Sequence, residues 1–372
     1  MEKKLCLFFN IASHYREHIY TLIDKEYNCD WFFGQNDTDI NSFDISKLKY
    51  SNILKKLNIF KNKIIWSKGL SKLIGNKKYK TYLLTGDSFN LSIWWFLILH
   101  KIFYRKKRVY LWTHGWYGKE TIIIKLLKKI YFGLADGIFL YGYYAKSLMI
   151  KEGIREDKLH VVHNSLQYED QLLLRKTLKL SNIYKDYFKN DNPVIIFIGR
   201  LTKVKRLDLL INVIANSKAK GKNYNLVFVG KGEEVFNLKE LAKERKVIDN
   251  IWFYGPSYDE KQNSELLYNA DLCVAPGNVG LTAIHSMMFG TPVLSHNNFP
   301  MQMPEFEAIK TGVTGGFFEY NNLDSIEKSI EEWFDLYEDK REIIRNNCYA
   351  EIDSQWNPEF QIKVLRENLI FE

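Results

Sequence analysis

The sequence predicts an α/β protein built from two doubly wound domains. Apolar, strand-like runs alternate with helical patterns along nearly the whole chain, as is typical of parallel α/β architecture. The alternation stops once, in polar and charged sequence between Leu172 and Asn192, and resumes after the Asp-Asn-Pro triplet at 191–193. With 372 residues, the chain is long enough to form two full hydrophobic cores.

These observations set the expected domain boundaries. Residues 1–172 form an N-terminal Rossmann-like domain, 173–192 a linker, and 193–350 a C-terminal Rossmann-like domain. Residues 351–372 form a C-terminal helix that we expect to pack back towards the N-terminal domain. Two domains of this kind predict a cleft between the facing carboxyl edges of their sheets, where α/β proteins bind ligands.

The elements of the N-terminal half follow from its apolar runs. Helical patterns lie between most of the strands, as at His14–Glu26 and Thr121–Leu134, whereas the Lys-rich segment Asn36–Asn62 fits no pattern. The predicted strands are Lys4–Phe9, Cys29–Gly34, Lys63–Ser67, Thr81–Gly86, Val109–His114, Gly137–Gly142 and Leu159–Asn164.

The C-terminal half repeats the alternation and ends in helices. Its predicted strands are Val194–Ile198, Asn225–Gly230, Ile251–Gly255, Leu272–Pro276 and Pro292–Ser295. Its predicted helices are Leu207–Lys218, Glu233–Lys246, Asp259–Asn269, Leu281–Phe289, Leu323–Tyr337 and Pro358–Leu369.

The net charge of +9 has three interpretations: binding to nucleic acid, binding to an anionic membrane surface, or an ordinary solvated face. No zinc-finger, RNA-recognition or helix-turn-helix signature is present, so we expect no nucleic acid partner. The apolar run Leu91–Phe103 is too short to span a bilayer. Trp94 and Trp95, with the basic run Arg105–Arg108, form either a membrane-facing patch or a buried helix with a charged tail.

Other features indicate a cytoplasmic protein that works without a metal. The N-terminus lacks the long apolar stretch and cleavage site of a signal peptide. The four cysteines lie far apart and show no metal-ligand spacing, so we expect reduced thiols. We therefore predict a cytoplasmic location, either free or peripheral at the inner face of the cell membrane.

Two turns of the C-terminal half suit a diphosphate. Arg200 and Lys205 follow the strand Val194–Ile198, and two cations at the entrance of a helix compensate the charge of an anion. The turn Gly280-Leu281-Thr282 opens another helix, where free N–H groups and a permissive glycine allow close approach of a phosphate. The alternatives are solvent-facing cations and an ordinary turn capped by Thr282.

Several motifs together resemble the retaining glycosyltransferases of family 4, which have the two-Rossmann GT-B fold. They are Gly199-Arg200 with Lys205, Val229-Gly230-Lys231-Gly232, Asn269-Ala270-Asp271 with Pro276, and the loop and helix Gly277–Phe289 before Gly290-Thr-Pro-Val293. Looser matches in the first half are Ser13-His-Tyr-Arg16, Thr113-His114-Gly115 and Val161-Val-His-Asn164.

The resemblance implies roles for these residues. His114, Arg200 and Lys205 would be catalytic, with the cations stabilising the leaving diphosphate and His114 positioning the donor sugar. His14 and Arg16 would contact the acceptor. The donor would be bound by Gly199, Gly230, Lys231, Gly277, Gly280, Leu281, Thr282 and His285.

The chain departs from the family at two positions. Family members usually carry two glutamates eight positions apart, where this chain has Gly277 and His285. In the family the first contacts donor sugar hydroxyls and the second holds the ribose diol. His285 retains a hydrogen-bonding imidazole, which can also be a packed, satisfied histidine. Glu305 and Glu307 are candidates for a substitute carboxylate.

The resulting hypothesis is a metal-independent retaining glycosyltransferase. It would move a sugar from a UDP- or GDP-type donor to a saccharide or lipid-linked saccharide, in bacterial surface polysaccharide synthesis, without a cofactor. The missing glutamates suggest an alternative, a non-catalytic nucleotide-sugar-binding or partner subunit. A dehydrogenase is disfavoured because no predicted strand leads into G-x-G-x-x-G.

Overall fold

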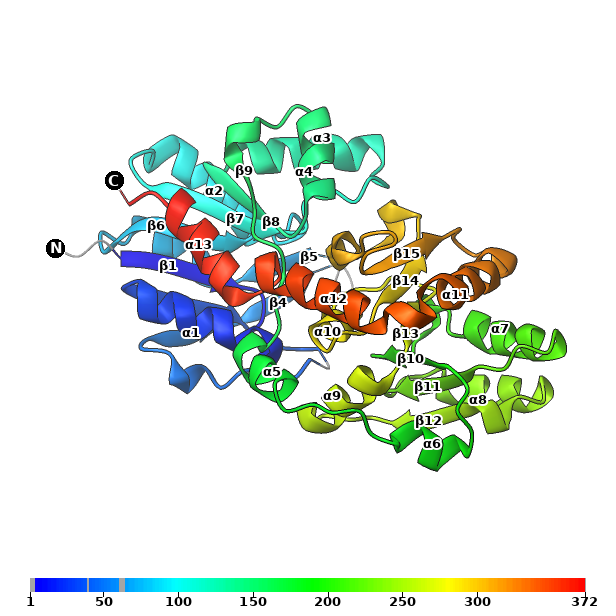
Figure 1. The fold of residues 1–372 in the computed structure, drawn as a ribbon. Coiled ribbons are helices and arrows are strands. Elements are labelled where there is room, and N and C mark those ends of the chain that lie inside the picture. The colour runs from blue at the N-terminus through cyan, green and yellow to red at the C-terminus, as the bar shows by residue number, and fades with distance from the viewer. Residues whose placement is uncertain (1–3, 39, 60–63, 372) are drawn as a thin grey trace. The chain divides into compact units, whose positions relative to one another are not determined.

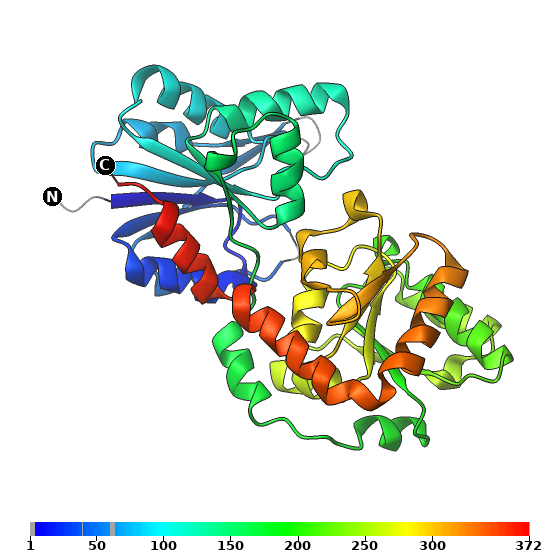
Figure 2. The same ribbon diagram turned by 45° about the horizontal axis from the view of Figure 1, so that its top comes forward.

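The chain consists of two compact α/β units in a computed structural model that describes residues 4–38, 40–59 and 64–371 (Figure 1). The N-terminal unit comprises residues 1–167 and 357–372, and the C-terminal unit comprises residues 168–356. Each unit contains a parallel sheet with helices on both faces, as shown by the two ribbon views (Figures 1 and 2). The expected class of two doubly wound domains is confirmed, and the cleft between their sheets stays a prediction.

The N-terminal unit is built on a seven-stranded sheet in the order β3-β2-β1-β6-β7-β8-β9. All of its paired neighbours are parallel. The strands are β1 Lys4–Phe9, β2 Cys29–Gly34, β3 Ser51–Leu54, β6 Tyr79–Thr85, β7 Arg108–Thr113, β8 Gly137–Leu140 and β9 Leu159–Val161. An antiparallel hairpin, β4 Lys56–Ile59 with β5 Ile64–Ser67, is inserted before β6. Both hairpin strands flank residues 60–63, so the predicted start of a strand at Lys63 lies outside the described residues.

Two hydrophobic clusters cover the faces of this sheet. One is formed with helices α1 (Glu17–Glu26) and α13 (Pro358–Asn368). The other is formed with α2 (Leu91–Phe103), α3 (Ile122–Gly133) and α4 (Tyr143–Lys151). Figure 2 shows α1 and α13 on the opposite side of the sheet from α3. Residues 357–372 thus belong to the N-terminal unit, whereas 351–356 belong to the C-terminal unit.

The C-terminal unit is built on a six-stranded parallel sheet in the order β12-β11-β10-β13-β14-β15. The strands are β10 Val194–Ile198, β11 Asn225–Val229, β12 Ile251–Gly255, β13 Leu272–Ala275, β14 Val293–His296 and β15 Gly315–Phe318. The helices are α5 Tyr168–Arg175, α6 Ile183–Phe188, α7 Asp208–Ala219, α8 Val235–Glu244, α9 Glu260–Asn269, α10 Thr282–Met288, α11 Leu323–Tyr337 and α12 Arg341–Gln355.

The strand order places a topological switch point between β10 and β13. The chain runs outward from β10 to β11 and β12, then returns to the other side of β10 as β13. The loops after β10 and β13 therefore diverge to opposite faces at the carboxyl edge, where open α/β sheets bind ligands. Both predicted diphosphate turns follow these two strands.

The predicted linker at 173–192 is corrected by the structure. It contains the end of α5 and all of α6, and both helices pack on the C-terminal unit. The Tyr184 hydroxyl donates to the carbonyl of Leu266 at 2.6 Å, and Arg175 forms an ion pair with Asp353 at 2.7 Å. The sequence suggested a linker because both helices are short and mostly polar. They are nevertheless ordered parts of the C-terminal unit, because these tertiary contacts hold them in place.

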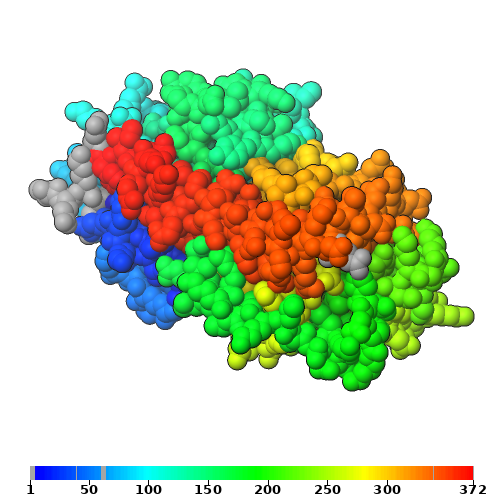
Figure 3. Space-filling view, viewed as in Figure 1, coloured from blue at the N-terminus to red at the C-terminus, as the bar shows by residue number. Residues whose placement is uncertain are grey.

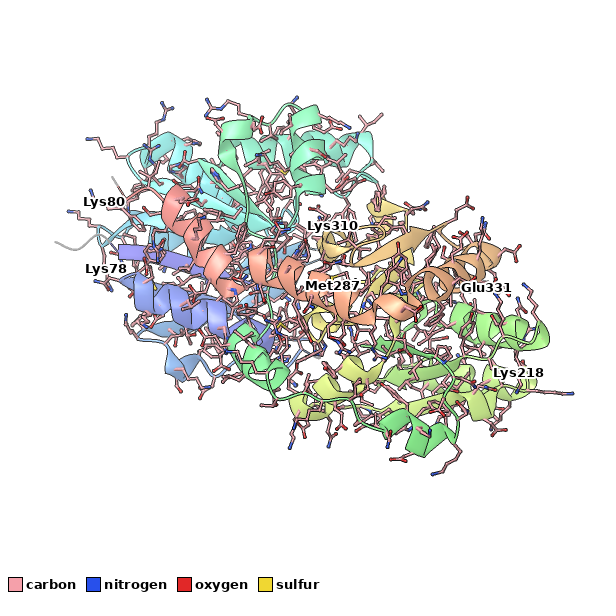
Figure 4. All side chains as sticks on the ribbon, viewed as in Figure 1. Lys78, Lys80, Lys218, Met287, Lys310 and Glu331 are labelled. Carbon is pink, nitrogen blue, oxygen red and sulfur yellow. The ribbon has the colours of Figure 1, made fainter. Side chains whose placement is uncertain are left out.

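The positive charge is distributed over both units. In Figure 4, Lys80 of the N-terminal unit and Lys218 of α7 in the C-terminal unit project outward from the ribbon. Many cations are paired, as in Lys78 with Asp30 at 2.5 Å and Lys220 with Glu327 at 2.5 Å. Much of the +9 charge thus fits the solvated-face interpretation. Among the described residues no helix is long and apolar enough to cross a membrane.

Candidate functional site

Lys205 joins the two loops at the switch point of the C-terminal unit. Its Nζ donates to the carbonyl and side-chain oxygens of Asn278, at 2.6 and 2.8 Å. Its own carbonyl accepts from the N–H of Gly277 at 2.9 Å. A Cβ on Gly277 would lie 2.0 Å from the carbonyl oxygen of Val204, so only glycine permits this approach of the two backbones. Gly277 is therefore needed to bring the β13 loop against Lys205.

The Lys205 ammonium lies in a partly desolvated, cationic environment. Its pKa is lowered from 10.5 to about 8, first by burial and then by the neighbouring charge of Arg200. The Glu305 carboxylate acts in the opposite direction. At neutral pH the ammonium is charged in a place where that charge is disfavoured, so a bound anion would stabilise it.

Arg200 is exposed at the carboxyl end of β10. Its guanidinium has no hydrogen-bond or ion-pair partner among residues 4–38, 40–59 and 64–371, and it lies close enough to Lys205 to depress that pKa. Gly199 and Gly230 let β10 and β11 end side by side, since a Cβ on Gly230 would lie 1.8 Å from the Gly199 carbonyl oxygen. The structure thus brings both predicted cations to one edge of the sheet.

The loop before α10 is fixed by buried hydrogen bonds. The Thr282 hydroxyl donates to the carbonyl of Ile198 at 2.8 Å, which ties α10 to the end of β10. The N–H of Val279 donates to Gln302 Oε1 at 2.9 Å, and Gln302 in turn donates to Ser295 and to the carbonyl of His296. Thr282 therefore anchors the loop, and the alternative of a helix capped by its side chain is not observed.

Two backbone donors remain available in this loop. Gly280 has φ of 56°, in the left-handed region that favours glycine. The N–H groups of Gly280 and Leu281 donate to no acceptor within the described part of the chain. Lys205 Nζ lies 4.0 Å from the Cβ position of Gly280. A cation and backbone donors thus converge at this turn, as anion binding requires.

His285 of α10 forms an ion pair that the sequence did not reveal. Its Nε2 lies 2.8 Å from Glu260 Oε1, at the start of α9, and the pair is partly buried. Glu260 also accepts from Gln171 Nε2 of α5 at 2.7 Å. Burial tends to raise the pKa of Glu260, but His285 and the hydrogen bonds hold it below its ordinary value. A carboxylate therefore stands beside His285, although position 285 itself carries no glutamate.

The two carboxylates considered from sequence lie elsewhere. Glu305 is 2% exposed in the short 3-10 helix Pro304–Ala308, where it influences Lys205. Glu307 is half-buried, and its carbonyl accepts from Lys310. Lys231 is exposed and lies 5.7 Å from the ring centroid of Tyr258.

In the N-terminal unit, Arg16 is enclosed by aromatic rings. Its guanidinium carbon lies 5.5, 5.2 and 5.3 Å from the ring centroids of Phe9, Trp112 and Tyr141, and it donates to the Tyr141 hydroxyl. Arg16 is only 9% exposed. By contrast, His14 is exposed and bonds through Nδ1 to the carbonyl oxygen of Asn41 at 3.1 Å. The two predicted acceptor residues thus have very different environments.

His114 follows β7 and lies against the same aromatic group. Its ring centroid is 4.7 Å from that of Tyr141. Burial, followed by the charges of Arg16 and Lys128, lowers its pKa from 6.5 to about 4. The imidazole is therefore neutral at physiological pH and can position a substrate through one donor and one acceptor.

A buried ion pair that sequence reasoning missed holds the loop after His114. Lys128 Nζ lies 2.7 Å from Glu120 Oε1 and donates to the carbonyl of Gly115 at 3.0 Å. Glu120 accepts from the N–H groups of Tyr117 and Gly118, both at 2.9 Å. Within the described ranges, no group of three or more His, Cys, Asp or Glu side chains could hold a metal ion.

The fold and the C-terminal site define a class of protein, one with two Rossmann-like domains and a cationic, donor-rich carboxyl edge. Residues 182–350 match the family of glycosyl transferases group 1. Most of the C-terminal unit therefore matches the group 1 glycosyl transferases, and this match supports transferase activity. The predicted recognition of the group 1 family is confirmed.

Relatives and solved structures agree with this assignment. An uncharacterized 41.2 kDa protein in the cps region of Klebsiella pneumoniae is 24% identical over 326 residues, covering 84% of this chain and 80% of that protein. The O-antigen biosynthesis glycosyltransferase WbnH of Escherichia coli is 26% identical over 241 residues, or 62% and 61% of the two chains. The crystal structure of Anabaena Alr3699/HepE in complex with UDP is similar with a TM-score of 0.72 at 16% identity, covering 98% and 99%. That structural likeness shows a shared GT-B fold.

Proposed function

We propose that this glycosyltransferase transfers a sugar from a nucleoside diphosphate sugar to a saccharide acceptor, with retention of anomeric configuration. One observation carries the proposal. Lys205, Arg200 and the free N–H groups of the 280–281 turn meet at the switch point of a parallel sheet. Diphosphates bind where cations and backbone donors converge in this way. A UDP- or GDP-type donor would supply the diphosphate, as UDP does in the Anabaena structure.

In the proposed reaction the bond between the anomeric carbon and the diphosphate oxygen breaks, and a bond to the acceptor oxygen forms on the same face of the sugar. The departing oxygen gains negative charge, which the Arg200 guanidinium and the Lys205 ammonium stabilise. That same oxygen accepts the proton of the acceptor hydroxyl, so no protein nucleophile is needed. The cations take the role that a metal has in other transferases.

The pair of His285 and Glu260 is proposed to hold the donor ribose. Glu260 has two carboxylate oxygens, and His285 Nδ1 is the second ring nitrogen, so the pair offers acceptors to the two hydroxyls of a diol. Both side chains are held before the donor arrives, because Gln171 fixes Glu260. The pair would therefore replace the ribose-binding glutamate that the resemblance leads one to expect.

The acceptor is proposed to be a saccharide or lipid-linked saccharide of a bacterial surface polysaccharide. The Klebsiella relative comes from a cps region, and WbnH acts in O-antigen biosynthesis. His114 would position the sugar as a neutral imidazole, and Arg16 and His14 would contact the acceptor. We place this activity in the cytoplasm, at the inner face of the membrane.

Transfer with isotope-labelled or fluorescent acceptors tests the function. Wild-type protein, incubated with UDP- or GDP-sugars and an oligosaccharide acceptor, should release the nucleoside diphosphate, and the new linkage should keep the donor's anomeric configuration in the NMR spectrum. Arg200→Ala should abolish the release, whereas Arg245→Ala, a cation at the distant end of α8, should not. A protein that binds the donor but never releases diphosphate with any acceptor would be the alternative, a non-catalytic subunit.

A further inference from the structure

Helix α3 carries a stripe of aliphatic side chains that points away from its own unit. At 100° per residue the stripe spans an arc of about 140° opposite the core-facing residues Tyr131 and Phe132. Single exposed apolar residues are common, but a contiguous aliphatic face of this kind marks an interaction surface. The exposed fractions are Ile122 86%, Ile123 72%, Leu126 60%, Leu127 46% and Ile130 51%.

The neighbouring helix α2 extends this surface. Trp94 of α2 packs against Tyr131 of α3, with ring centroids 5.0 Å apart, so the two helices lie side by side on one face of the sheet. Beyond that contact α2 exposes Trp95, Ile102 and Phe103. Both ribbon views place α3 on the outside of the N-terminal unit, and in Figure 3 the segment around α3 and α4 forms part of the outer surface. We call the exposed apolar residues of α2 and α3 the apolar surface.

The charge near the apolar surface is mostly positive, although Lys101 and Lys125 are paired with Asp136 and Glu152. Between residues 88 and 135 the only acidic residue is Glu120, which is buried against Lys128. Lys106 and Lys129 form no ion pair within the described residues. The cations of this segment are Lys101, Arg105, Lys106, Lys107, Arg108, Lys119, Lys125, Lys128 and Lys129.

We propose that the apolar surface of α2 and α3 inserts into the headgroup region of an anionic lipid bilayer. Aliphatic side chains with an exposed tryptophan, flanked by lysines, have the composition of helices that lie in a membrane interface. The lysines complement the negative surface potential of such a membrane. A second copy of this chain fits less well, because a two-fold contact would bring each lysine against lysines of the same surface.

Vesicle sedimentation tests this proposal on the full-length protein. Wild type should sediment with vesicles of phosphatidylcholine and phosphatidylglycerol at low ionic strength, less at high ionic strength, and weakly with phosphatidylcholine alone. The double variant I123D/L126D should lose more than tenfold in partition coefficient. The matched control Phe236→Asp, at a 73% exposed residue of α8, should change it less than twofold.

Two further variants examine the charge and the depth of insertion. Lys129→Glu should weaken partition to anionic vesicles severalfold, whereas Lys328→Glu on α11 should leave it unchanged. Brominated lipids should quench tryptophan fluorescence in wild type, and this quenching should fall in Trp95→Phe. If I123D/L126D fails to fold, Ile122→Ser, at the most exposed position of the stripe, takes its place.

Three outcomes would overturn the proposal. The first is that wild type does not sediment with anionic vesicles. The second is that the folded I123D/L126D variant binds these vesicles as tightly as wild type. The third is that wild type dimerises without lipid, whereas I123D/L126D stays monomeric. Donor binding by the C-terminal unit should be the same in all these variants. A failure of membrane binding is thereby distinguished from a failure of the proposed function.

Discussion

Replacement of Lys205 by methionine should weaken donor binding and stabilise the free protein. Methionine keeps an unbranched side chain that is one heavy atom shorter, and it removes the ammonium that we assign to the diphosphate. The pKa of Lys205 lies at about 8, compared with 10.5 for an ordinary lysine. At 1.36 kcal/mol per pKa unit, the folded protein disfavours the charged form by about 3 kcal/mol.

The stability gain is smaller than this figure. Lys205→Met also loses two hydrogen bonds to Asn278, worth about 1–3 kcal/mol together. We therefore expect a net gain of about 1 kcal/mol, which raises the melting temperature by about 2–4 °C for a unit of this size. The difference in stability between Lys205→Met and wild type depends on pH. Between about 8 and 10.5 the unfolded chain holds more protons than the folded one, so wild-type stability rises there relative to the variant.

Donor binding should change in the opposite direction. Loss of one charge-assisted hydrogen bond, worth about 1.5–3 kcal/mol, weakens the Kd for a nucleoside diphosphate by roughly 10- to 150-fold. Because a bound diphosphate raises the pKa of Lys205, the wild-type Kd should be about tenfold weaker at pH 9 than at pH 7. Lys205→Arg stays charged and should lose that dependence. Calorimetry and thermal melts measure both effects, and a Kd unchanged in Lys205→Met would refute the reasoning.

Three further predictions concern the two units. Gly277→Ala should destabilise the C-terminal unit by about 2 kcal/mol or more and abolish donor binding, because the new Cβ would lie 2.0 Å from the Val204 carbonyl oxygen. Denaturant melts measure this loss of stability, and the control Gly133→Ala, where the space is open, should show none. Glu260→Gln should weaken the Kd of the nucleoside diphosphate severalfold while that of inorganic pyrophosphate stays constant, and an equal loss for both ligands would contradict the ribose assignment. Because the pKa of His114 is about 4, its titration should give no inflection in the pH profile of kcat/KM between pH 5 and 8. His114→Ala should lower kcat and leave the shape of that profile unchanged. An inflection near pH 6.5 in wild type that is absent from His114→Ala would show that the imidazole titrates normally.

Strands that are buried on both faces could be predicted closely from the sequence. β10 is a run of five buried apolar residues, and its predicted and observed bounds coincide at Val194–Ile198. β3 and β15 were missed because they lie at sheet edges, where pairing depends on tertiary structure. β15 begins with Gly315, and a Cβ there would lie 1.8 Å from the carbonyl oxygen of Val293. Its two glycines allow that close pairing but reduce the local strand signal.

The site was predictable where it is local in sequence and not where it is assembled by packing. Arg200, Lys205 and the 280–282 turn each follow a strand end, so their shared sheet edge could be inferred. Glu260 and His285 are 25 residues apart and meet only because α9 packs beside α10. The role of Gln302 has the same origin, since its side chain crosses from a later loop to Val279.

The stripe on α3 shows a different limit. The sequence predicts a helix at Thr121–Leu134, but this prediction did not say which of its side chains face the core. Only the structure separates the core-facing residues from the exposed Ile122, Ile123 and Leu126. The basic run Arg105–Arg108 was recognised, but the aliphatic face beside it was not.

The most direct test of the account is the affinity of Arg200→Ala for a nucleoside diphosphate, measured by calorimetry beside wild type and Arg245→Ala. The account predicts that wild type and the α8 control bind UDP or GDP with the same Kd and that Arg200→Ala binds at least tenfold more weakly. Equal binding by all three proteins would show that Arg200 does not recognise the diphosphate, which contradicts the account.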